Sequence, residues 1–140
     1  MKADFARNIW DVNEMARIEK GIKVVRSSDP ELLTGEVGWS VKPLISNKYA
    51  NSEKIWMGWV NFEPNGKHDW HTHEEEDEAL IVIAGEIAFY YKRGDKVIEE
   101  KLKEGDAAFV PMKLEHKFEN SAKPLTAIVG KAPSPPGAGR

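Results

Sequence analysis

Residues 71–85, HTHEEEDEALIVIAG, hold the most chemically specific pattern in the chain and run directly into one of its most apolar stretches. His71 and His73 are two residues apart, so on an extended strand both imidazoles lie on the same face. The acidic run 74–77 is a poor strand former and predicts a turn. Glu78 then opens an apolar strand. The stretch therefore predicts a strand, a turn and a second strand, with metal-ligating side chains on either side of the turn.

A fourth ligating side chain comes later in the sequence, at His116. On an extended strand His116 shares one face with Phe118 and Asn120, while Lys117 and Glu119 point the other way. Lysine and glutamate are typical solvent-facing residues. The face that carries His116 is therefore predicted to be the inner one.

Three imidazoles and one carboxylate around a single point form a site for one divalent first-row transition metal. The candidate ligands are His71, His73, Glu78 and His116. Neutral imidazole suits Fe, Mn, Ni, Co, Cu or Zn, and the residue types do not choose among them. In an octahedral site four protein ligands leave two positions for water, O₂ or a chelating substrate. The alternative for an isolated His-x-His pair is two surface histidines beside an acidic loop.

Short apolar stretches recur through the rest of the chain, separated by turn signals such as Pro64-Asn65-Gly66. Many short strands at this spacing are typical of an all-β sandwich or barrel. Gly85 and Gly105 stand at turns where a positive φ costs little only for glycine. One short helix is expected, at 13–19. The expected strands are 36–45, 55–63, 78–84, 86–91, 97–102, 107–110, 116–119 and 125–129.

The spacing of these residues also resembles a known family. The sequence reads Gly66-x4-His71-x-His73-x4-Glu78-x6-Gly85 and, further on, Gly105-x5-Pro111-x4-His116-x3-Asn120. Together these resemble the two cupin motifs, G-x5-H-x-H-x3,4-E-x6-G and G-x5-P-x-G-x2-H-x3-N. The resemblance implies a double-stranded β-helix, or jelly-roll barrel, with metal ligands at His71, His73, Glu78 and His116. Two departures are visible: Gly66 stands one residue closer to the histidines, and Lys113 replaces the second motif's middle glycine.

The resemblance divides the chain into three parts: an N-terminal extension at 1–34, a cupin barrel at 35–131 and a Pro/Gly-rich flexible tail at 132–140. Within the barrel, 55–60 and 79–84 are apolar at both odd and even positions. A strand that is apolar on both faces requires a second covering layer. We expect either the N-terminal extension or the partner in a homodimer to supply it, and favour the homodimer.

Composition excludes several classes of protein. The net charge is −3 with mixed signs, which argues against a nucleic-acid partner, and no apolar run reaches the ~20 residues of a membrane span. The first residues lack a secretory signal, so we expect a cytoplasmic protein. Cysteine is absent. Lysine and glutamate number 15 and 16, a bias found in heat-adapted proteins, so a thermostable protein is one expectation.

The favoured function is a metal-dependent enzyme acting on a small, oxygen-rich organic molecule, first as an Fe- or Mn-type dioxygenase-like oxidoreductase. A sugar-type isomerase or epimerase, a non-catalytic metal-containing binding module and a structural role are the alternatives. Tyr91 is the candidate general acid, although a buried phenol would fit the same pattern. His68 is expected to be a loop residue out of register with the ligand pair. The acidic run 74–77 is expected to disfavour anionic substrates, an effect that a metal's charge can reverse locally.

Three tryptophans have two interpretations. Trp56, Trp59 and Trp70 can wall a pocket for a planar or sugar-like ligand, but clustered aromatics in a small barrel more often belong to the core or to a dimer interface. We favour the second interpretation for all three.

Overall fold

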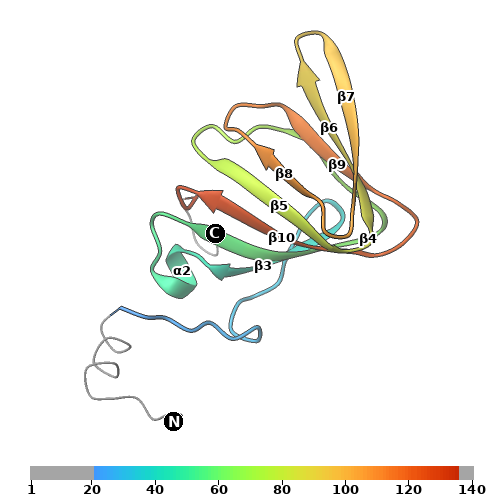
Figure 1. Ribbon diagram of the computed structural model, residues 1–140. Coiled ribbons are helices and arrows are strands. Elements are labelled where there is room, and N and C mark those ends of the chain that lie inside the picture. Colours follow the sequence, from blue (N-terminus) through green and yellow to red (C-terminus); the bar gives the residue numbers. More distant parts are fainter. Residues whose placement is uncertain (1–20, 136–140) are drawn as a thin grey trace, which may run out of the picture.

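The computed structural model describes residues 21–135, which form one nine-stranded sheet that curls into a nearly closed barrel (Figure 1). The predicted all-β jelly-roll class is confirmed. The helix expected at 13–19 lies outside the described residues. The elements are β2 (Leu33–Thr34), β3 (Val37–Ile45), α2 (Asn47–Ala50), β4 (Trp56–His71), β5 (Asp77–Ala84), β6 (Glu86–Arg93), β7 (Lys96–Lys103), β8 (Ala107–Val110), β9 (His116–Asn120) and β10 (Leu125–Ala132).

Neighbouring strands follow the order β7-β6-β9-β4-β10-β5-β8, and β3 pairs with β4 while β2 pairs with β3. Every strand pair is antiparallel. Strand β4 lies at the centre of this arrangement, because β3, β9 and β10 all pair with it. The order therefore brings the end of β4 beside the start of β9, although the two are far apart in sequence.

Alternation of buried and exposed side chains fixes the barrel interior. On β5, Glu78, Leu80 and Val82 are buried. On β9, His116 and Phe118 are buried with Asn120, which confirms the predicted inner face. Burying this apolar set supplies most of the folding free energy, at about 25 cal/mol per Å² of apolar surface removed from water.

The predicted turn at Pro64-Asn65-Gly66 is wrong, since β4 continues through it to His71. The turn-forming residues instead make an irregularity inside the strand. Asn65 has φ 63°. The pairing of β3 with β4 shifts in register between Phe62 and Lys67, the part of β4 that contains Asn65. Gly66 packs so closely on Gly38 that a Cβ there would lie 2.4 Å from the Gly38 carbonyl oxygen. The same residues that end strands elsewhere thus bend β4 without ending it.

Gly85 and Gly105 have φ values of 96° and 89°, as expected from the sequence. The two strands that the sequence marks as apolar on both faces present Met57, Trp59 and Ile81 outward, each with about 40% of its surface exposed. Within residues 21–135 no element covers this outer face. No helix of the described chain has the length and apolarity to cross a membrane.

Candidate metal centre

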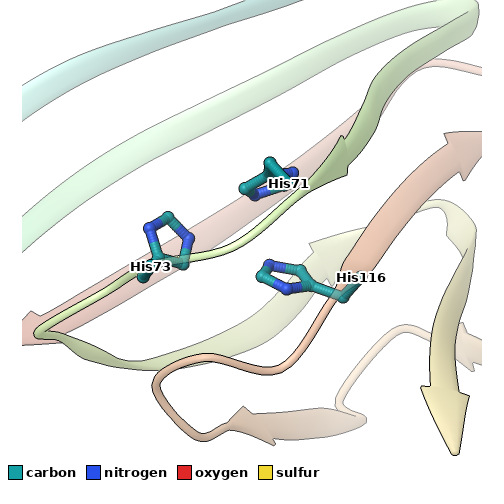
Figure 2. Close-up of side chains that lie close together, drawn as sticks. All are labelled: His71, His73 and His116. Atoms are coloured by element: carbon teal, nitrogen blue, oxygen red, sulfur yellow. The ribbon is translucent and has the colours of Figure 1, made fainter. Parts of the chain in front are cut away.

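Three imidazoles from two separate parts of the chain converge inside the barrel (Figure 2). His71 is the last residue of β4 and His116 is the first residue of β9. Their ligating nitrogens and one from His73 all lie within 4.8 Å of one another. His73 lies two residues past the end of β4, so the predicted placement of His71 and His73 on one continuous strand is wrong. The loop after β4 nevertheless returns His73 to the same point.

Backbone carbonyls orient two of the rings. His71 Nδ1 donates to the Asp69 carbonyl oxygen at 2.6 Å, and His116 Nδ1 donates to the Leu114 carbonyl oxygen at 2.8 Å. A carbonyl oxygen can only accept, so each Nδ1 carries the hydrogen and leaves Nε2 with its lone pair. Metal-ligating histidines are held in the same way by a partner on the opposite ring nitrogen.

Glu78 completes the group of polar side chains. Its Oε1 lies 2.8 Å from His73 Nε2. The Nε2 atoms of His73 and His116 are buried, and neither makes a well-aligned hydrogen bond with the described residues. Buried polar atoms without such a bond are rare in proteins. The imidazole and carboxylate donors therefore fit a divalent transition metal.

Burial lowers the pKa values of His71 and His116, because a low-dielectric environment disfavours the charged imidazolium. The pKa of His71 falls to about 4, and the pKa of His116 is also lowered. Burial alone would raise the pKa of Glu78, but the contact with His73 and the positive charge of Lys131 keep it below its usual value. At neutral pH His71 and His116 are neutral and Glu78 is ionised, the states that metal binding requires.

His68 does not lie in a loop, contrary to the sequence prediction. It is part of β4 and lines the same cavity as His71. The pairing of β4 with β9 changes register between these two residues, and their rings stack with centroids 3.9 Å apart. Trp39 stacks on His68 at 4.6 Å. Odd and even positions of a regular strand face opposite sides, so the sequence predicts His68 and His71 on different faces. The register shift between them places both on the same face.

The cavity beside the histidines has a volume of about 440 Å³. Its polar end is formed by His71, His73 and Glu78, and most of the remaining wall is apolar. Of the three tryptophans considered above, Trp56 lines the cavity, while Trp59 points outward. Trp70 contacts two lysine ammonium groups, those of Lys92 at 4.8 Å and Lys117 at 5.3 Å from its ring centroid.

Tyr91 lies directly across from His116 in the pairing of β6 with β9. It packs against Phe89 and lines a different cavity, of about 560 Å³, between β6 and β8. The structure thus places Tyr91 next to the candidate centre but on the wall of another cavity. Its predicted catalytic role stays a prediction.

A short turn between β8 and β9 ties the two histidine-bearing segments together. Lys113, which occupies the glycine position of the second motif, has φ 69° and donates its N–H to the His73 carbonyl oxygen at 2.7 Å. Met112 donates its N–H to Asp77 Oδ1 at 3.0 Å. The motif's glycine position thus requires a left-handed backbone in this chain too, and Lys113 adopts it.

Sequence reasoning missed several groups that build the site. The carbonyls of Asp69 and Leu114 have no sequence signature, because every residue carries one. Lys131 lines the cavity from β10 and does have a signal. It continues the inward-facing row of Leu125, Ala127 and Val129, where an apolar residue would be expected.

Comparison with known proteins identifies the relatives of this chain. The family model described as "Cupin domain" matches residues 58–129. The Bacillus subtilis (strain 168) protein YdbB is 28% identical over 64 residues, which are 46% of this chain and 54% of YdbB. This chain thus spans about half the length of that relative.

Solved structures share the fold. KdgF from Halomonas sp. superposes with a TM-score of 0.64 at 18% identity, covering 81% of this chain and 94% of KdgF. An RmlC-like cupin from Shewanella frigidimarina NCIMB 400 gives a TM-score of 0.66 at 17% identity over 79% of this chain and 90% of that one. Oxalate decarboxylase from Bacillus subtilis gives 0.71 at 17% identity, over 83% of this chain and 30% of that enzyme. At such identities the likeness shows the fold alone.

Proposed function

The chain belongs to the cupin-domain family, and from that premise we propose that it is a metal-dependent enzyme acting on a small, oxygen-rich organic molecule. One observation carries the proposal. His71, His73 and His116 direct ligating nitrogens to one point beside an ionised Glu78, at the polar end of a cavity large enough for a small molecule.

The proposed ligands are His71, His73, Glu78 and His116. When bound there, a divalent metal would supply Lewis acidity and an attachment point for substrate oxygens. The protein's own contribution is to fix the ligands. The Asp69 and Leu114 carbonyls orient two imidazoles.

Within this class we favour an Fe- or Mn-type dioxygenase-like oxidoreductase. A sugar-type isomerase needs its own base near the substrate, and Tyr91 lines the other cavity. A mostly apolar wall also suits a sugar poorly. A metal-containing binding module without turnover is the second candidate. The observation in its favour is that, of the side chains of residues 21–135 that line the cavity, only His68 and Lys131 are titratable groups outside the proposed ligand set.

The test is elemental analysis of protein purified without a metal-binding tag, beside the double variant His71→Ala/His116→Ala. We expect near one equivalent of a divalent transition metal in the wild type and none in the variant. The matched control is Lys117→Gln, on the outward face of β9. Iron or manganese would direct the next assay to oxygen uptake. Failure of the wild type to bind any metal, even after reconstitution, would overturn the proposal.

The proposed homodimer and heat stability have their own measurements. We propose that a second copy covers the outer apolar face containing Met57, Trp59 and Ile81. Light scattering on a sizing column should give twice the chain mass, and Trp59→Lys should give the monomer. A melting midpoint above about 65 °C would support the thermostable expectation, and a lower one would count against it.

A further inference from the structure

The wall beside the candidate ligands carries a positive charge that the proposed function does not use. Lys131 lies on β10, paired on one side with Glu78 of β5 and on the other with Trp56 of β4. Its Nζ stands 5.0 Å from the centroid of the Trp56 ring, and both residues line the cavity. The ammonium is thus held by neighbouring strands at the cavity, beside the carboxylate that completes the metal centre.

The electrostatic effect of Lys131 agrees with this placement. Its charge contributes to lowering the pKa values of Glu78 and His116 and of the cavity histidine His68. A cation that influences three groups around one cavity raises the local affinity for an anion, and it opposes the repulsion expected from the acidic run 74–77. An ammonium has three N–H donors, so a ligand oxygen can join the interactions that Lys131 already makes.

The remaining side chains of the cavity wall favour ligands of a particular shape. Trp39 and His68 stack against each other on one part of it, and Trp56, Phe62 and Phe118 contribute further rings. The Trp56 indole N–H is buried and has no hydrogen-bond partner among residues 21–135. Aromatic surfaces favour flat, apolar ligand bodies, and they offer few partners for the many hydroxyl groups of a sugar.

We propose that the substrate is a planar organic acid whose anionic oxygens bind between the metal centre and Lys131, while its apolar body packs against the aromatic wall. This inference rests on the proposed function, since it places a second anchor beside the proposed metal. It adds the charge and the shape of the substrate. Lys131 acts as a binding residue, through a charge-assisted contact with the substrate's carboxylate.

The test uses zinc-loaded protein, because zinc has no redox chemistry, and isothermal titration with three probes. Salicylate is a planar acid, salicylamide is its neutral counterpart, and glucuronate is an acid with a sugar body. We expect salicylate to bind at least about tenfold more tightly than either of the others. Lys131→Met should remove most of the salicylate preference, Lys131→Arg should keep it, and Lys101→Met on β7 should change nothing.

Zinc content is measured in every sample, so that failure of the proposed metal site can be distinguished from failure of the proposed substrate. Unchanged salicylate affinity in a zinc-loaded Lys131→Met protein would overturn the role of Lys131. Equal affinity for glucuronate, or no binding of any probe at millimolar concentration, would overturn the planar acid. Absence of zinc from the wild type would contradict the proposed function instead. The same titrations on that metal-free protein would then test Lys131, and a salicylate preference lost in Lys131→Met would still support it.

Discussion

Two parts of the chain bring histidines to the same point, and their backbones differ: His116 comes from a regular strand, while His71 and His73 come from an irregular segment. The β9 arm (116–120) is a short regular strand in which burial alternates without exception. The β4 arm (66–78) contains a register shift, the end of a strand and a loop. His116 is fully buried, whereas His71 and His73 are half-buried. The regular arm thus carries a fully buried candidate ligand, and the irregular arm carries two candidate ligands that are more exposed.

The largest effect is expected from removing the fully buried candidate ligand. His116→Ala should lower metal affinity by at least about 100-fold, because a proposed ligand is lost. His68→Gln should keep metal affinity within about threefold, because His68 lines the cavity without belonging to the ligand cluster. Competition with a chromogenic chelator measures both. A loss of metal in His68→Gln would show that the β4 arm supplies a further ligand.

A smaller effect is expected where the two arms are tied together. Asp77→Ala removes the acceptor for the Met112 N–H, and the turn that holds the His73 carbonyl then loosens. Metal affinity should fall by about tenfold, with a loss of about 1 kcal/mol in the free energy of unfolding.

Asp77→Asn is the matched control, since it keeps an oxygen acceptor and should restore both values. Unchanged metal affinity in Asp77→Ala would mean that the β4 arm holds His73 without help from the turn.

The difference between the arms also marks what could be predicted from sequence. The inner face of β9 follows from side-chain alternation, and the motif spacing selects Glu78, so the ligand candidates could be chosen without coordinates. The position of His68 could not, because one shift of register reverses which side chains share a face. The carbonyls that orient His71 and His116 are invisible in sequence, since they belong to the backbone.

A third effect is the dependence of the free energy of unfolding on pH, to which two histidines of the β4 arm contribute. Burial lowers the pKa of His68 to about 3 and that of His71 to about 4. In the unfolded chain these imidazoles take up protons near pH 6.5, so between pH 7.5 and 5 the unfolded state binds more protons than the folded one. The free energy of unfolding of the metal-free protein should therefore fall as pH decreases through this range.

Urea denaturation at several pH values measures this dependence. His68→Gln removes one of the groups that is protonated only in the unfolded chain, so its stability should change less with pH than that of the wild type. All four histidines of the chain lie at this site, so no exposed histidine is available for a control substitution. The control is therefore Lys101→Gln on β7. A pH dependence equal to the wild type's in His68→Gln would contradict burial of a neutral His68.

The smallest effect is expected at Lys113, whose left-handed backbone links the arms through its N–H. Lys113→Gly relieves a conformation that is unfavourable for residues with a Cβ, but it also makes the unfolded chain more flexible. The two terms partly cancel, so a net gain of about 0.5 kcal/mol is expected. Lys113→Val should lose about 1 kcal/mol, because branching at Cβ makes the left-handed region less accessible.

Thermal melting of both variants measures the difference. Neither variant removes the N–H that holds the His73 carbonyl, so metal affinity should stay unchanged in the glycine variant. A higher affinity there would mean that strain in this turn keeps the β4 arm from its best position for the metal.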